Sequence, residues 1–179
     1  MDKVSCCACD SSTKSERGVL IEYLYLDLNT CDRCIGTEQE LEMVVSTLSP
    51  ALNLAGYTVE YRKIEIISEE VAEKHKFLSS PTIRVNGKDI CQFVVENNCG
   101  CCGEISGTDV DCRIFEYNGG TYEVAPKEML AEAILKEVFG MVEVTGACSE
   151  YRLPGNLKAF FDGKILKDYG NCSGGSGCC

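Results

Sequence analysis

The segment that most constrains the fold is a nearly continuous apolar run, Val19–Leu26, with a pair of cysteines shortly after it. Apolar residues at consecutive positions predict a central strand that is covered on both faces. Cys31 and Cys34 follow at CxxC spacing, and from Ile35 onward apolar residues recur at helical spacing. We therefore expect the two thiols between a strand and a helix, where the helix dipole and free backbone N–H groups favour thiolates.

The pattern beyond this helix predicts an α/β fold. A second strand is expected over Tyr57–Ile67 and a short helix after Ser68, which gives a parallel strand–helix–strand crossover. The Asn86-Gly87 and Asn118-Gly119 pairs predict two antiparallel hairpins. Pro126 then opens a final helix of the core.

This order of elements, with CxxC after the first strand and Ser80-Pro81-Thr82-Ile83 before a hairpin, resembles the thioredoxin superfamily. More narrowly, the chain is similar to an uncharacterised prokaryotic family of cysteine-rich thioredoxin-like proteins. The resemblance covers residues 19–140 and implies a thioredoxin-like sandwich, in which helices flank a central mixed sheet. It also implies a cis Ser80–Pro81 bond facing the CxxC. The chain departs from the superfamily in having CDRC in place of CGPC and no tryptophan.

The resemblance assigns roles to three residues. Cys31 would be the exposed thiol that attacks a disulfide, and Cys34 the buried thiol that resolves the mixed intermediate. Pro81, beside them, would hinder tetrahedral metal capture at the CxxC. The implied activity is dithiol–disulfide exchange with a thiol or disulfide protein partner, so the chain is a possible thiol–disulfide oxidoreductase.

A second group of cysteines lies in a predicted Gly-rich insertion at 96–112. The group consists of Cys99, Cys101, Cys102 and Cys112. Clustered thiolates suit zinc or another soft metal or metalloid, such as mercury or arsenic, ahead of an Fe–S cluster. The spacing matches neither a standard zinc finger nor a ferredoxin, so it does not name the metal. A disulfide switch and a group without function remain alternatives.

The two ends of the chain carry further thiols. A polar arm, residues 1–18, holds Cys6, Cys7 and Cys9, and is expected to be flexible unless a metal orders it. The extension 141–179 is expected to dock a short amphipathic helix over Leu157–Phe161 and to end in a Gly/Ser tether. Its terminal pair, Cys178-Cys179, resembles the mobile C-terminal cysteines of mercuric reductases. Both ends are therefore predicted metal ligands, with incidental surface thiols as the alternative.

Net charge, apolar segments and cysteine content exclude some classes of function and favour others. The net charge of −11 argues against binding to nucleic acid or to anionic membranes. No apolar stretch is long enough to span a membrane and the N-terminus lacks a signal-peptide pattern, so we expect a cytoplasmic protein. In that compartment thiols stay reduced, and 14 cysteines indicate metal or redox chemistry rather than a disulfide framework. His75, the only histidine, is expected to be a solvated surface residue.

Two functional hypotheses follow. The first is a thioredoxin-like thiol protein that combines CxxC exchange with binding or transfer of zinc, mercury or arsenic. The alternative is a structural zinc or Fe–S module in which the CxxC is the only active group. The sequence leaves the oligomeric state and the cysteine pairing open.

Overall fold

The computed structural model describes residues 17–91, 93–140 and 150–171, and a four-stranded mixed sheet lies at its centre. The strand order is β2-β1-β3-β4. Strand β1 (Arg17–Tyr25) pairs in parallel with β2 (Tyr57–Glu65) and antiparallel with β3 (Thr82–Val85), which in turn pairs antiparallel with β4 (Lys88–Asp89). The predicted central strand is β1, whose Val19, Ile21, Tyr23 and Leu24 side chains are buried.

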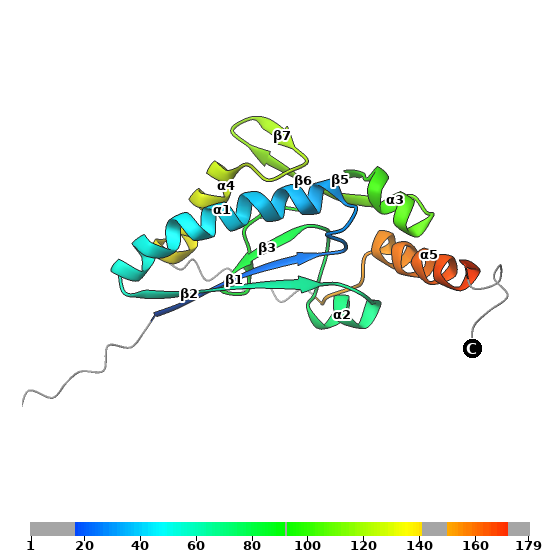
Figure 1. Ribbon diagram of the computed structural model, residues 1–179, viewed down its shortest axis with the longest axis horizontal. Helices are drawn as coiled ribbons and strands as arrows, with labels where there is room; N and C mark the ends of the chain where they lie inside the picture. The colour runs from blue at the N-terminus through cyan, green and yellow to red at the C-terminus, as the bar shows by residue number, and fades with distance from the viewer. Residues whose placement is uncertain (1–16, 92, 141–149, 172–179) are drawn as a thin grey trace, which may run out of the picture.

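Helices cover both faces of this sheet, as expected for a strand without a solvated face. Helix α1 (Asp32–Leu54) and helix α4 (Lys127–Phe139) lie together on one side, and α2 (Glu69–Lys74) lies on the other (Figure 1). Ser68 caps α2 by accepting a hydrogen bond from the backbone N–H of Val71. The predicted α/β class, with a mixed sheet and flanking helices, is confirmed.

Both predicted hairpins are present. The Asn86 and Gly87 residues have φ values of 52° and 80°, and Asn118 and Gly119 have φ values of 50° and 79°. Positive φ at both central positions is the geometry that tight hairpins require, and asparagine and glycine tolerate it best. The Ser80–Pro81 peptide bond is cis, as expected.

The cysteine-rich insertion is not the Gly-rich loop that we expected. It contains β5 (Val95–Asn98), α3 (Gly100–Ser106) and β6 (Asp111–Tyr117), and β6 joins β5 and β7 (Gly120–Tyr122) in a three-stranded antiparallel sheet. The glycines at 100 and 103 are part of the helix rather than of turns. Because β5 pairs with β6, the two ends of the segment between these strands lie close together. The segment is short and therefore holds only a short helix.

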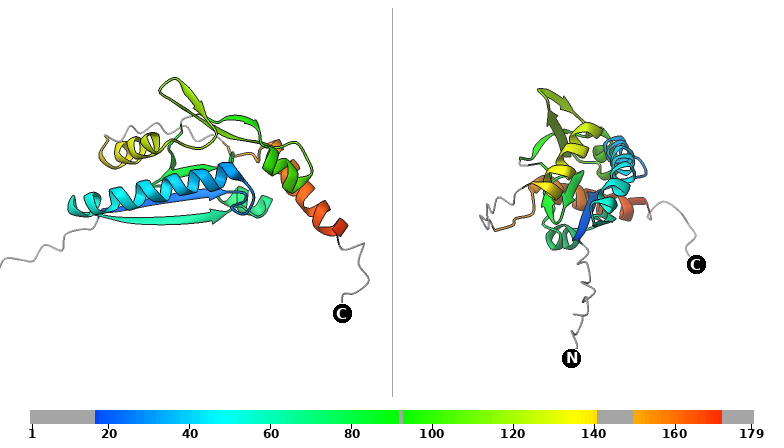
Figure 2. Two further views of the ribbon diagram at one scale, coloured as in Figure 1. Left: turned by 45° about the horizontal axis from the view of Figure 1, so that its top comes forward. Right: turned by 90° about the vertical axis from the view of Figure 1, so that its left-hand side faces the viewer.

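The C-terminal extension contributes a helix longer than predicted. Helix α5 (Gly155–Asn171) lies side by side with α3 (Figures 1 and 2). Its Leu157, Phe160 and Phe161 are buried in the same hydrophobic cluster as the central cysteines. Helix α5 therefore packs in one hydrophobic cluster with the end of β1, the first CxxC and the insertion. Among the described residues, no helix is long and apolar enough to cross a membrane.

Candidate metal centre

Three cysteines that are far apart in the sequence meet in the core. The Sγ atoms of Cys31, Cys99 and Cys102 all lie within 4.8 Å of one another, and all three residues are buried. The Sγ atoms of Cys31 and Cys102 are 3.8 Å apart. In a tetrahedron of thiolates around zinc, with Zn–S bonds of about 2.3 Å, neighbouring sulfurs are also about 3.8 Å apart. The three thiols thus have a spacing suited to a single soft ion.

Cys112 lies next to this group of three. Its Sγ lies 3.4 Å from Cys102 Sγ, and its thiol also contacts Cys99. Cys112 therefore touches two members of the group of three. We refer to Cys31, Cys99, Cys102 and Cys112 as the thiol tetrad. Each of these residues is at most 2% exposed.

Two helix N-termini hold three of these thiols. Cys31 is the N-cap of α1 and Cys99 is the N-cap of α3, and neither side chain makes a capping hydrogen bond. Cys102 lies one turn into α3, as Cys34 does in α1. The insertion therefore contains a second CxxC, Cys99-x-x-Cys102, which faces the first. Our sequence interpretation placed Cys99 in one group with Cys101, Cys102 and Cys112 and did not identify this repeat, although the identical spacing in both segments was the available signal.

Cys34 is the fifth thiol of the cluster and lies at its edge. It contacts Cys31, and its Sγ lies 3.3 Å from the hydroxyl of Ser80, the residue before Pro81. The buried Tyr23 hydroxyl donates a 2.7 Å hydrogen bond to the carbonyl oxygen of Cys34. Within the group of three, Cys34 contacts Cys31, whereas Cys112 contacts Cys99 and Cys102.

The loop that leads into Cys31 is organised by one carboxylate. Asp27 Oδ1 accepts hydrogen bonds from the backbone N–H groups of Asn29, Thr30 and Cys31, at 2.9, 2.6 and 3.2 Å. Burial raises the pKa of Asp27, but the hydrogen bonds from Thr30 and Asn29 outweigh burial and leave this pKa below its ordinary value. The carboxylate therefore fixes the backbone immediately before the first thiol.

Arg33 connects the first CxxC to the insertion. Its buried guanidinium donates to the carbonyl oxygens of Asn98 and Cys112, at 2.9 and 3.2 Å, and to Glu123 Oε1 at 2.6 Å. A weaker contact reaches the Asn97 carbonyl at 3.4 Å. One cationic side chain from α1 thus holds β5 and β6, and with them Cys112, against the N-terminus of its own helix.

The backbone of β6 is also attached to the loop before Pro81. The Arg113 N–H donates to the Ser80 carbonyl at 2.7 Å, and the Arg113 guanidinium binds both carboxylate oxygens of Asp89, at 2.9 and 2.8 Å. Cys112, the preceding residue, is therefore held at its own carbonyl by Arg33 and through the anchored backbone of Arg113. These contacts place the insertion over the first CxxC.

The thiols of the tetrad differ in the direction in which their pKa values are shifted. Contacts from the Cys102, Cys112 and Cys31 thiols lower the pKa of Cys99 well below its ordinary value. Contacts with Cys112, Cys31 and Cys99 raise the pKa of Cys102. The arrangement therefore favours a thiolate at Cys99 with neighbouring thiols as hydrogen-bond donors. Such a shared proton network is a suitable precursor to metal binding, which replaces those protons.

The expectation of an exposed Cys31 is wrong, because its exposed fraction is 0%. In the thioredoxin resemblance this thiol faces solvent, but here the insertion and the Cys102 side chain cover it. An external protein disulfide has no direct approach to its sulfur. Pro81 is likewise buried, and its loop contacts the first CxxC through Ser80 and Cys34.

The remaining predicted ligands lie elsewhere. Cys101 is half-buried on α3 and is not part of the group of three, because adjacent helical residues point in different directions. Cys91, which is not among the predicted ligands, is half-buried beside Arg113. The predicted ligands at both ends of the chain lie outside the described residues: Cys6, Cys7, Cys9, Cys178 and Cys179.

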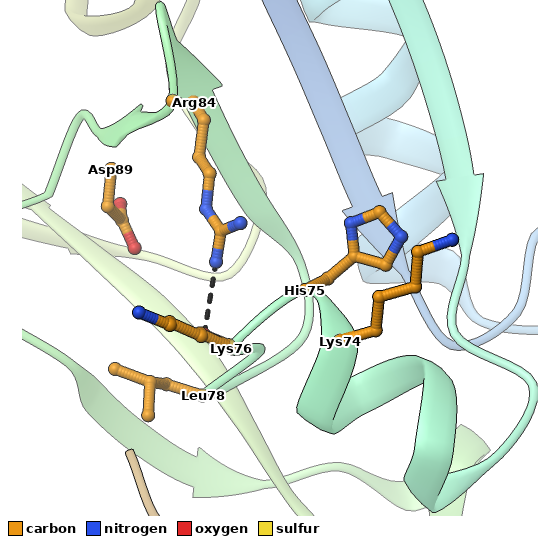
Figure 3. Close-up of a pocket in the computed structure, with 7 residues that line it drawn as sticks. Lys74, His75, Lys76, Leu78, Arg84 and Asp89 are labelled. Carbon is orange, nitrogen blue, oxygen red and sulfur yellow. Dashed lines mark hydrogen bonds between the residues drawn. The ribbon is translucent and has the colours of Figure 1, made fainter. Parts of the chain in front are cut away.

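A surface pocket of about 370 Å³ lies between the end of α2 and the β3–β4 hairpin (Figure 3). Cationic side chains dominate its lining: Lys74, Lys76 and Arg84, with His75 beside them. Arg84 donates a 3.1 Å hydrogen bond to the Lys76 carbonyl. No cysteine lines this pocket, so it is separate from the thiol chemistry.

Comparison with known proteins gives one match. Residues 19–134 match the family described as "Domain of unknown function (DUF2703)". This range includes all five clustered cysteines. No curated protein and no solved structure matches the chain.

Proposed function

The chain belongs to the DUF2703 family, whose description assigns no activity, and we propose from the geometry that the protein binds one soft metal ion through the thiol tetrad. The observation that carries the proposal is the convergence of three buried sulfurs within 4.8 Å, with a fourth in contact. Buried thiols are otherwise scattered through a core as small apolar side chains. Their concentration at two facing helix N-termini is typical of ligands.

The spacing favours a single ion. In a four-iron cluster each thiolate binds a different iron, so its sulfurs lie farther apart than around one tetrahedral ion. The 3.8 Å and 3.4 Å separations in the tetrad fit the single-ion case. Zinc fits the donor set, and mercury and trivalent arsenic share its preference for thiolates.

The test is metal stoichiometry on full-length protein purified without oxygen and reconstituted with zinc. We expect one ion per chain, with loss of tight binding in Cys99→Ser and Cys102→Ser. Cys91→Ser, outside the cluster, should bind like the wild type. Cys101→Ser separates the structural assignment from the sequence-based one, because only the latter makes Cys101 a ligand. Wild-type protein that binds no ion, or binding that depends on Cys101 but not on Cys102, would contradict the proposal.

A second candidate is thioredoxin-like dithiol chemistry at Cys31 and Cys34. It is supported by the strand order β2-β1-β3-β4 and by the CxxC at the N-terminus of α1. The burial of Cys31 argues against exchange with large substrates. A disulfide-reduction assay with an insulin-type substrate decides the question, since a general oxidoreductase would lose its turnover in Cys31→Ser.

The terminal cysteines extend the proposal to metal transfer. Helix α5 is about 21 Å long between Leu157, which shares a hydrophobic cluster with the tetrad, and Asn171. The chain from Asn171 to Cys178 spans at most about 25 Å when extended. A tail of that length can return to the cluster, and a short tether gives a local concentration in the millimolar range. Cys178→Ser/Cys179→Ser protein should then load zinc from a competing chelator more slowly, with unchanged final stoichiometry.

A further inference from the structure

Cys31 belongs to two pairings at once. It is a member of the thiol tetrad through its contacts with Cys99 and Cys102, and it is the first cysteine of the CxxC that ends in Cys34. A sulfur that forms a disulfide cannot at the same time be a thiolate ligand. Metal binding and oxidation of the first CxxC therefore exclude each other.

Cys34 is the one thiol of the first CxxC that does not belong to the thiol tetrad. Its thiol contacts Cys31, the Ser80 hydroxyl and the backbone of Asp27 and Leu26. Cys99, Cys102 and Cys112 contact one another, and Cys34 interacts with Cys112 only electrostatically. A tetrahedral ion takes four ligands, so a fifth thiol next to one ligand is not needed for binding. Its position suits it to capture Cys31.

We propose, on the basis of the proposed metal site, that oxidation of Cys34 by a small hydroperoxide releases the bound ion by converting Cys31 from a ligand into half of a Cys31–Cys34 disulfide. Sulfur of Cys34 attacks the terminal oxygen of the peroxide, which breaks the O–O bond and gives a sulfenic acid. Cys31 then attacks the Cys34 sulfur and displaces hydroxide. For hydrogen peroxide, one Cys34 thiol and one Cys31 thiolate yield one disulfide, one water and one hydroxide.

The environment supports this order of events. A hydroperoxide is small enough to reach a buried thiol through a local opening, whereas a protein disulfide is not. In the metal-loaded protein the ion would bind a lone pair of each tetrad sulfur. The lone pairs of the Cys34 sulfur would remain available to attack a peroxide. Loss of Cys31 leaves the site with three ligands and lowers its affinity, since each thiolate contributes to soft-ion binding.

The experiment uses zinc-loaded full-length protein treated with hydrogen peroxide, with a chromogenic chelator to detect free zinc. We expect the wild type to release zinc in step with formation of a Cys31–Cys34 disulfide, identified by peptide mass mapping. Cys34→Ser and Cys34→Ala should keep the bound zinc and lose this peroxide-dependent release. Cys91→Ser is the matched control, and it should release zinc as the wild type does.

Two outcomes overturn the inference in different ways. If Cys34→Ser and Cys34→Ala bind zinc and release it as fast as the wild type, or if the mapped disulfide lacks Cys34, the release mechanism is wrong and the metal site stands. If wild-type protein holds no ion before oxidation, the proposed function fails and the release mechanism fails with it.

Discussion

The Sγ atoms of Cys31 and Cys102 lie 3.8 Å apart although the two residues are 71 positions apart in the chain. Each belongs to its own CxxC segment, and each segment begins a helix. The contact is therefore created by the fold, and specifically by the packing of the insertion over the first CxxC.

Arg33→Gln should destabilise the protein and weaken the metal site together. The guanidinium is buried and satisfies carbonyl oxygens of Asn98 and Cys112, which would lose their donors. Losing charge-assisted hydrogen bonds of this kind costs about 2–4 kcal/mol. Chemical denaturation measures the loss, and a zinc competition assay measures the affinity.

The matched control for Arg33 is Arg62→Gln. Arg62 pairs with Glu60 on the surface, with 54% of its side chain exposed. Exposed ion pairs contribute little to stability, because water and salt screen them. Equal effects of the two substitutions would show that Arg33 does not hold the insertion in place.

Asp27→Asn should lower stability at neutral pH and flatten its dependence on acid. Hydrogen bonds hold the pKa of Asp27 below its ordinary value of 3.8, so the folded state binds its proton less tightly than the unfolded state. The carboxylate therefore contributes stability above pH 3.8, and this contribution is lost as pH falls through the lower folded-state pKa. The asparagine oxygen can still accept these hydrogen bonds, so the expected loss is that of their charge assistance, about 1 kcal/mol.

Asp32→Asn is the control for Asp27, because Asp32 is exposed and lies on the other side of Cys31 in the sequence. Urea titrations at a series of pH values provide the comparison. The assignment of the loop-fixing role to Asp27 is wrong if the two variants have the same pH profile.

Gly163→Ala should separate α5 from α3. A Cβ atom at Gly163 would lie 2.5 Å from the backbone oxygen of Ser106 and 2.9 Å from a methyl carbon of Thr108. Overpacking against backbone costs about 1–3 kcal/mol. Gly155→Ala, at the beginning of the same helix, meets nothing within 4 Å and should be neutral or slightly stabilising. Thermal unfolding distinguishes the two, and equal midpoints would contradict this close approach.

Alkylation rates should follow burial rather than the thioredoxin resemblance. In the folded protein, Cys31 should react with iodoacetamide more slowly than the half-buried Cys101, and denaturant should abolish the difference. Peptide mass mapping over time measures both rates. Rapid, selective labelling of Cys31 would instead support an exposed nucleophile.

Local signals in the sequence were sufficient for much of the fold. The apolar run at Val19–Leu26 predicted the central strand, and two Asn-Gly pairs predicted the hairpins. Both features depend on the backbone preferences of a few adjacent residues, which a sequence displays directly. The cis Ser80–Pro81 bond was instead implied by the resemblance to the thioredoxin superfamily.

The thiol tetrad depends on contacts that no local pattern contains. Cys99 and Cys112 were predicted as ligands, but grouping Cys31 with them requires β6 to attach to Ser80 and Arg33 to bind the insertion. The Gly-rich composition of residues 99–103 indicated a loop, whereas burial against α5 stabilises a helix there. Helix geometry then separates Cys101 from Cys102, which sequence adjacency alone does not show.

The most direct test of the metal site is X-ray absorption spectroscopy of the zinc-loaded full-length protein at the zinc edge. We expect four sulfur neighbours at about 2.3 Å and no second metal nearby. In Cys102→Ser the sulfur count should fall, while in Cys91→Ser it should not change. A first shell of nitrogen or oxygen atoms in the wild type would contradict the account, because it would place the ion outside the thiol tetrad.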